Sequence, residues 1–215
     1  GSATVLCTDK TGTLTVNRMS IDELRLPDGG VHAVRTDASP SAAHAELLRV
    51  GILASAPEPF DPMETAFHDL GNQWGLAASH RHTLLRSYGL RPDLLAVTQV
   101  WRDANAGLLV AVKGAPEAVA RLCDADPEQM SRLKIAVDAM AREGLRVLGI
   151  ARGNFEGEEL PDDPQQFTFT FVGLVGLAAP LREGVPAAMA ECRSAGIRVV
   201  MITGDYPATA CAIAR

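Results

Sequence analysis

Residues 9–15 read DKTGTLT, and only Thr8 separates them from an apolar run, ATVLC, at residues 3–7. This run is expected to form a short buried strand, because a polar turn that contains glycine follows it. Such a strand would deliver Asp9 and Lys10 at its carboxyl end, which is the edge where open α/β sheets place their chemistry. The stretch therefore predicts a parallel sheet with a chemically active edge.

A second stretch of the same kind lies near the other end of the chain. Residues 197–202 are apolar apart from Arg198 and run into Thr203, Gly204 and Asp205. A helix is expected over residues 183–195, because apolar residues recur there at helical spacing and Gly196 supplies a stop signal. Another helix is expected to begin near Pro207. The order helix, strand, helix implies a parallel sheet with crossover helices.

The middle of the chain has a different pattern. Helices are expected at about residues 42–56 and 63–74, and two antiparallel strands at residues 96–101 and 108–112. Helices at about 116–123 and 127–143 come before strands at 145–151 and 167–177. We therefore expect the α/β fold class, with a partial Rossmann-like parallel sheet (residues 1–17 and 179–215) that carries a large inserted α+β domain built on an antiparallel sheet (residues 18–178).

Composition restricts the partners of this 215-residue chain. Its formal net charge of -6 argues against nucleic acid, because binding to a phosphate backbone needs a basic face. The most apolar stretch, residues 167–181, is interrupted by glycines and is shorter than the roughly 20 residues that span a bilayer. The four cysteines are far apart, so they predict buried thiols in a reducing cytosol rather than a zinc site or disulfides.

The residue types at positions 9–15 suit phosphoryl chemistry. A carboxylate at the end of a strand can attack phosphorus if cations and backbone N–H groups offset the repulsion between two anions. Lys10, the turn at Gly12 and a divalent ion would supply that offset, with the hydroxyls of Thr11 and Thr13 positioning phosphoryl oxygens. The alternative is a polar turn that only links two elements, but a heptapeptide of this kind after an apolar strand favours the chemistry.

The sequence resembles a known family at this point. DKTGTLT at residues 9–15 resembles the phosphorylation motif of P-type ATPases, which lie within the haloacid-dehalogenase-like (HAD-like) superfamily. Three more motifs follow in the family's order: KGAPE at 113–117 resembles its nucleotide-binding motif, APLR at 179–182 its DPxR hinge motif, and TGD at 203–205 its TGD motif. The resemblance implies an ATP-driven cation pump that forms an aspartyl phosphate at Asp9, with a HAD-like phosphorylation domain and an inserted nucleotide-binding domain.

The resemblance also implies a set of site residues, with ATP and Mg2+ as cofactors. The catalytic residues are Asp9, Lys10, Thr11, Thr203, Gly204 and Asp205, and the Mg2+ ligands are Asp9 and Thr11. The residues that bind the nucleotide are Glu64, Lys113, Gly114, Arg146 and Arg182.

For some of these positions the local sequence also suggests a role in binding phosphate or nucleotide. Lys113 ends an apolar strand before a Gly and a Pro, which would project its ammonium from a turn into a cleft. Thr203 and Asp205 come before an expected helix, whose free N–H groups suit a phosphoryl oxygen, although both residue types are also common N-caps. Glu64 and Arg146 would otherwise be read as surface residues or as a structural ion pair.

Two features refine the resemblance. KGAPE, together with Glu64 and Arg146, is similar to the type II group that includes calcium pumps, but the transported ion stays open among calcium, magnesium, sodium, potassium and manganese. Ala179 stands where the hinge motif has Asp, and Leu90 stands where calcium pumps stack adenine on an aromatic ring. Because stacking of a base contributes roughly 1–3 kcal/mol, weak nucleotide affinity is expected.

The resemblance implies further partners and a location. The parent would be an integral membrane protein, bacterial, with this part on the cytoplasmic side of the cell membrane. Its partners would be the actuator domain of the same parent chain and a transported cation, held by transmembrane helices outside this sequence. The chain itself is expected to be a soluble, monomeric fragment that binds nucleotide without efficient phosphorylation or turnover, because the family's GDGxND motif does not occur before Arg215.

Two alternatives belong to other functional classes. A soluble HAD-like phosphatase typically has a second Asp two residues after the nucleophile, which acts as general acid and base. Thr11 occupies that position here, which favours a longer-lived phosphoenzyme. The other alternative is a nucleotide-binding module without catalysis, which the intact DKTGTLT argues against.

Overall fold

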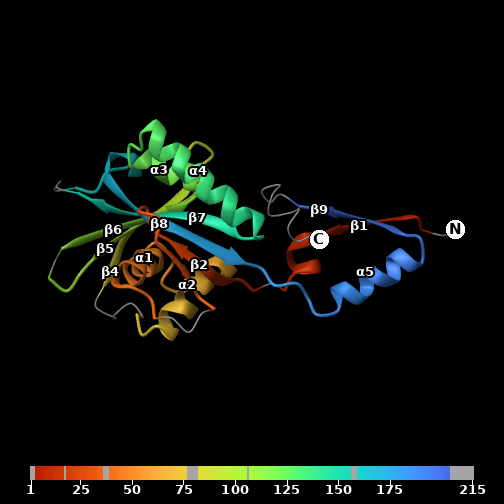
Figure 1. Cartoon of the computed structure of the whole chain (residues 1–215). Coiled ribbons are helices and arrows are strands. Elements are labelled where there is room, and N and C mark those ends of the chain that lie inside the picture. The colour runs from red at the N-terminus through yellow and green to blue at the C-terminus, as the bar shows by residue number, and fades with distance from the viewer. Residues whose placement is uncertain are drawn as a thin grey trace.

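The computed structural model describes residues 3–16, 18–35, 39–76, 82–105, 107–155 and 159–203. Within these ranges the strands form two sheets, a parallel pair in the order β1-β9 and a seven-stranded sheet in the order β3-β2-β8-β7-β6-β5-β4. Figure 1 shows the two sheets at opposite ends of an elongated molecule, joined by two lengths of chain. The expectation of a mixed α/β fold with a large antiparallel sheet is therefore confirmed.

The seven-stranded sheet is antiparallel throughout its described pairings. In chain order its strands are β2 (Ser20–Arg25), β3 (Val31–Ala33), β4 (Thr83–Tyr88), β5 (Ala96–Arg102), β6 (Leu108–Gly114), β7 (Arg146–Asn154) and β8 (Thr168–Ala178). The expected hairpin is the pair β5 and β6, whose register runs from Ala96↔Gly114 to Arg102↔Leu108. The expected strands at residues 145–151 and 167–177 are β7 and β8.

Three strands of this sheet, β2, β3 and β4, were not predicted. β3 has only three residues, too few for a pattern. In β2 and β4 the pairing register shifts between Ile21 and Glu23 and between Leu84 and Arg86, so apolar and polar residues do not alternate regularly. In β2, moreover, the charged Glu23 is buried and forms an ion pair with Arg25 at 2.7 Å. A charged residue at a buried position hides the apolar pattern by which a core strand is recognised.

Helices cover both faces of the seven-stranded sheet (Figure 1). α1 (Ala42–Leu53) and α2 (Pro62–Gln73) pack on one face, and α3 (Pro116–Leu122) and α4 (Pro127–Arg142) on the other. The apolar residues between α1, α2 and the sheet, such as Leu47 and Phe67, are fully buried. All four helices agree with the sequence within a few residues at each end.

The parallel pair consists of β1 (Val5–Asp9) and β9 (Arg198–Ile202), with α5 (Val185–Ser194) before β9. The prediction of a buried first strand is wrong, because Val5 is 52% exposed and Leu6 is 45% exposed. A sheet of two described strands offers few neighbours that could cover these side chains, and no residue of α5 is buried either. The prediction of buried thiols likewise fails for Cys7, which is exposed. The helix expected near Pro207 lies outside the described residues.

The chain leaves the parallel pair and returns to it along one narrow path. Thr15 and Leu181 form an antiparallel bridge, the backbone N–H of Val16 donates to the carbonyl of Pro180 at 2.9 Å, and that of Arg182 donates to the carbonyl of Leu14 at 2.9 Å. Two connecting segments therefore cross between the sheets side by side. None of the described helices has the length and apolar character of a membrane span.

Candidate functional site

A cavity of about 640 Å³ opens beside the first turn of α2, the start of β5, the end of β6 and the start of β7. Its walls include four of the expected nucleotide-binding residues, Glu64, Lys113, Gly114 and Arg146, and also Leu90. These residues come from α2, β6, β7 and the segment after β4. Folding thus gathers motifs that are far apart in the sequence around one hollow, which we call the motif cavity.

Lys113 is held in the wall of the motif cavity rather than projected from a turn. It lies within β6 and is only 7% exposed. Its Nζ donates to the carbonyl of Ala54 at 2.9 Å, to Oγ of Ser55 at 2.9 Å, and to Oε1 of Glu64 at 2.5 Å. Because an ammonium has three hydrogens, these acceptors engage all of them. The expectation of a projecting ammonium is therefore corrected: β6 points Lys113 toward the end of α1.

The charge of Lys113 is offset by one carboxylate. Burial lowers the pKa of Lys113, while the hydrogen bond and the charge of Glu64 act in the opposite direction. Glu64 is itself fixed from two sides, because its Oε2 accepts from the backbone N–H of Ala56 at 3.3 Å. Its side chain remains 18% exposed, so the carboxylate keeps acceptor capacity toward the cavity.

Arg146 and Gly114 have different parts in the cavity. Arg146 opens β7 with an exposed side chain, which makes its guanidinium accessible to an anion. Gly114 allows β5 and β6 to approach at the cavity floor, because a Cβ there would lie 2.3 Å from the carbonyl oxygen of Leu95. Any larger residue at position 114 would push the two strands apart.

Sequence reasoning missed several residues of this site. Ala54 and Ser55, which accept hydrogen bonds from Lys113, lie just after α1 and belong to none of the recognised motifs. Phe60 and Leu95 line the cavity and are exposed. Only the position of Phe60, four residues before Glu64, could have drawn attention to it.

A second group of expected residues lies at the carboxyl ends of β1 and β9, around Asp9 and Thr203. We call this place the acidic edge. Asp9 ends β1 as an exposed residue and pairs in register with Ile202, so Thr203 follows directly at the same sheet edge. Lys10 is buried and begins a single π-helical turn, Lys10–Leu14, in which Gly12 has a φ of 77°. The side chain of Thr11 and both Gly204 and Asp205 lie outside the described part of the structure.

Arg182 belongs to the acidic edge and does not line the motif cavity. Its Nε donates to the carbonyl of Thr13 at 3.0 Å, and its Nη2 donates to the carbonyl of Gly12 at 2.7 Å. Arg182 thus braces the turn that follows Asp9. The structure separates it from the four other residues with which the sequence grouped it.

The acidic edge is compatible with Mg2+. No group of three or more His, Cys, Asp or Glu residues in the described ranges could hold a metal ion. Mg2+ needs no such cage, since it is usually bound by one or two carboxylates together with waters and substrate phosphates. The exposed carboxylate of Asp9 fits that donor set.

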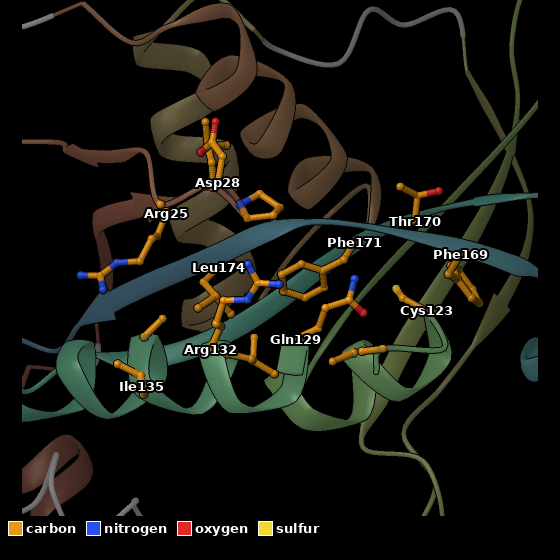
Figure 2. Close-up of a pocket in the computed structure, with 17 residues that line it drawn as sticks. Arg25, Asp28, Cys123, Gln129, Arg132, Ile135, Phe169, Thr170, Phe171 and Leu174 are labelled. Atoms are coloured by element: carbon orange, nitrogen blue, oxygen red, sulfur yellow. The ribbon is translucent and has the colours of Figure 1, made fainter. Parts of the chain in front are cut away.

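A second cavity, of about 670 Å³, lies between α4, β8 and the β2–β3 turn (Figure 2). Its arginines are already paired: Arg25 with Glu23 at 2.7 Å and Arg132 with Glu128 at 3.4 Å. Burial raises the pKa of Cys123 on its wall to about 12, so this side chain stays a neutral thiol. The second cavity contains none of the expected site residues, which makes the motif cavity the stronger candidate.

The antiparallel sheet beside the motif cavity is formed by strands that lie in the sequence between β1 and β9, an arrangement consistent with a nucleotide-binding domain. Residues 96–184 match the family model described as P-type ATPase, cytoplasmic domain N. Over its full length the chain is 30% identical to the sodium/potassium-transporting ATPase subunit alpha of Hydra vulgaris and 28% identical to the plasma membrane calcium-transporting ATPase 4 of Bos taurus. It is also 30% identical to the probable cation-transporting ATPase F of Mycobacterium tuberculosis (strain ATCC 25618 / H37Rv).

The chain is thus similar to cation-transporting P-type ATPases, and its residues 96–184 are similar to their cytoplasmic domain N. The chain spans 25%, 21% and 28% of the length of the three relatives, in the order given. The similarity therefore covers this chain completely but only about a quarter of each pump.

Proposed function

We propose that the chain is the ATP-binding and phosphorylation region of an ATP-driven cation pump, and that Asp9 becomes an aspartyl phosphate in the whole protein. The observation that carries the proposal is the meeting of Glu64, Lys113, Gly114 and Arg146 at one cavity. The similarity to transporting ATPases over the whole chain supports it. The parent protein would place this region on the cytoplasmic side of a membrane, with an actuator domain and a transported cation as further partners.

The motif cavity has the chemistry to hold a nucleotide. Glu64, fixed by Lys113 and Ala56, would accept a hydrogen bond from the amino group of adenine. The apolar side chains of Leu90 and Leu95 would flank the base. The guanidinium of Arg146 would meet a phosphate, because its planar fork of donors matches phosphate oxygens. In this arrangement Lys113 positions Glu64 and contributes its charge to the site from the wall.

The acidic edge has the chemistry to accept a phosphoryl group. A carboxylate oxygen of Asp9 would attack the terminal phosphorus of ATP, forming the acyl phosphate as the bond to the bridging oxygen breaks and ADP leaves. The hydroxyl of Thr203 and the N–H groups of the turn that starts at Lys10 would stabilise the phosphoryl oxygens. Gly204 and Asp205 would complete this edge.

Asp9 and Thr11 would hold Mg2+, whose positive charge, when the ion is bound, offsets the repulsion between the carboxylate and the phosphate. Arg182 would keep the turn after Asp9 in place through its two carbonyl contacts.

We further propose the domain division that this chemistry requires. Residues 1–17 and 179–215 would be a HAD-like phosphorylation domain, and residues 18–178 the nucleotide-binding domain. The division is supported by the two separate sheets and by the paired crossing at Thr15 and Leu181. Bending at this crossing would bring a nucleotide in the motif cavity toward Asp9.

The test uses the whole pump, incubated with ATP labelled in its terminal phosphate and quenched in acid. Asp9→Asn should abolish the acid-stable, hydroxylamine-sensitive phosphoenzyme, because an amide cannot form the acyl phosphate. Asp93→Asn, at an exposed ion pair with Arg91, serves as the control and should leave it unchanged. A normal amount of phosphoenzyme in Asp9→Asn would reject the proposal.

A further inference from the structure

Phe60 stands almost entirely in solvent at the rim of the motif cavity. Its exposed fraction is 96%, and Leu90 and Leu95 on the same rim are 67% and 55% exposed. Single exposed apolar residues are ordinary, but a cluster beside a cavity marks a surface that contacts a ligand. Two separate segments of the chain supply this cluster: the one before α2 carries Phe60, and the connection between β4 and β5 carries Leu90 and Leu95.

Folding gives no reason for a phenylalanine at this position. Asp61 is the N-cap of α2 and accepts from the backbone N–H of Met63 at 2.8 Å, so Phe60 is the residue just before the cap. An apolar residue there often packs against the first turns of its helix and fixes the entry of the chain. A ring that is 96% exposed makes no such packing contact.

The backbone that carries Phe60 is nevertheless well fixed. Pro62 occupies the first turn of α2, and the carboxylate of Asp61 also accepts from the backbone N–H of Glu64, at 3.4 Å. Phe60 is therefore attached to the same rigid helix start that positions Glu64. An aromatic ring has only two side-chain torsions, so ordering it against a ligand has a small entropic cost.

We infer that Phe60 is the aromatic surface on which the base of the bound nucleotide stacks, with Leu90 and Leu95 on the rim beside it. The inference rests on the proposed nucleotide site. Among the described residues that line the motif cavity, Phe60 is the one aromatic side chain. It supplies the ring that Leu90 does not, from a different segment, so the affinity for ATP is higher than Leu90 alone would suggest. Stacking of a base on a protein ring typically strengthens binding by about tenfold or more.

Calorimetric titration of the chain with ATP and, separately, with tripolyphosphate tests the role of Phe60. Phe60→Ala should weaken ATP binding about tenfold and leave tripolyphosphate binding unchanged, because only ATP has a base. Phe60→Leu keeps apolar area without a ring, so its affinity for ATP should lie between those of the wild type and Phe60→Ala. The control is Ile135→Ala, which removes an exposed apolar side chain at the second cavity and should change neither affinity.

A gain-of-signal variant completes the experiment. Phe60→Trp should keep the affinity for ATP, and its added fluorescence should be quenched by ATP but not by tripolyphosphate. If wild type and Phe60→Ala bind ATP equally, or if Phe60→Ala loses both ligands alike, the stacking role is wrong while the nucleotide site stands. If the folded wild-type chain binds no ATP, the proposed function itself fails.

Discussion

The ammonium of Lys113 lies 2.5 Å from Oε1 of Glu64, and the two side chains are 8% and 18% exposed. This pair forms part of the wall of the motif cavity and joins β6 to α2. An ion pair with so little water around it adds little net stability, but removing one partner leaves a buried charge that is costly. The pair is therefore best understood as fixing the direction of the Glu64 carboxylate.

The pair makes a direct prediction for stability. Glu64→Ala should lower the free energy of unfolding by about 3 kcal/mol, because Lys113 would keep only the neutral acceptors of Ala54 and Ser55. Urea unfolding followed by circular dichroism measures this. Glu117→Ala removes an exposed carboxylate from the same cavity and should change stability by less than about 0.5 kcal/mol. If the two substitutions change the free energy of unfolding equally, the ion pair between Lys113 and Glu64 does not contribute to stability.

The lowered pKa of Lys113 predicts a pH dependence. Burial makes the folded chain release this proton at a lower pH than the unfolded chain, in which lysine titrates near 10.5. Between those two pKa values the unfolded chain binds more protons, so the contribution of Lys113 to the free energy of unfolding rises with pH. The free energy of unfolding of the wild type, relative to that of Lys113→Met, should therefore increase as the pH rises toward 10.5. A difference that falls over this range would mean that Glu64 outweighs burial.

Gly114 offers a test of the cavity floor. Gly114→Ala should destabilise the chain by about 1–3 kcal/mol, because its Cβ would meet the carbonyl oxygen of Leu95 at 2.3 Å and force β5 away from β6. Gly89→Ala is the matched control, since nothing lies within 4 Å of a Cβ there. Thermal unfolding of both variants measures the effect. If Gly114→Ala is as stable as Gly89→Ala, the two strands do not approach as closely as described.

Arg182 should act on the turn after Asp9 rather than on nucleotide binding. Arg182→Ala removes donors from the carbonyls of Gly12 and Thr13, so amide hydrogen exchange in residues 10–16 should become about threefold faster or more. Affinity for ATP should stay at the wild-type value. Arg193→Ala on the exposed side of α5 is the control and should alter neither quantity. A large loss of ATP affinity in Arg182→Ala would show instead that Arg182 takes part in nucleotide binding.

The regular elements could be predicted where one physical signal dominated. α4 follows an Asp126 capping box and has its apolar residues at helical spacing, so both its start and its extent follow from local sequence. β2 could not be found, because its bulge interrupts the alternation and its buried Glu23 is polar. Its place beside β8 depends on a pairing between distant parts of the chain, which no local pattern encodes.

The site was predictable to a similar extent. The motifs named Glu64, Lys113, Gly114 and Arg146, and folding places all four on one cavity. The motifs could not say where the ammonium of Lys113 points, because its acceptors at Ala54 and Ser55 are set by the packing of α1 against β6.

Nuclear magnetic resonance of the 15N-labelled chain during titration with ATP tests most directly whether the motif cavity binds the nucleotide. The amide signals of Gly114, Arg146 and Glu64 in the motif cavity should show saturable shifts. Signals of Gln129, Arg132 and Phe171 around the second cavity should stay in place. Saturable shifts confined to the second cavity, or no shifts at any ATP concentration, would show that the motif cavity does not bind the nucleotide.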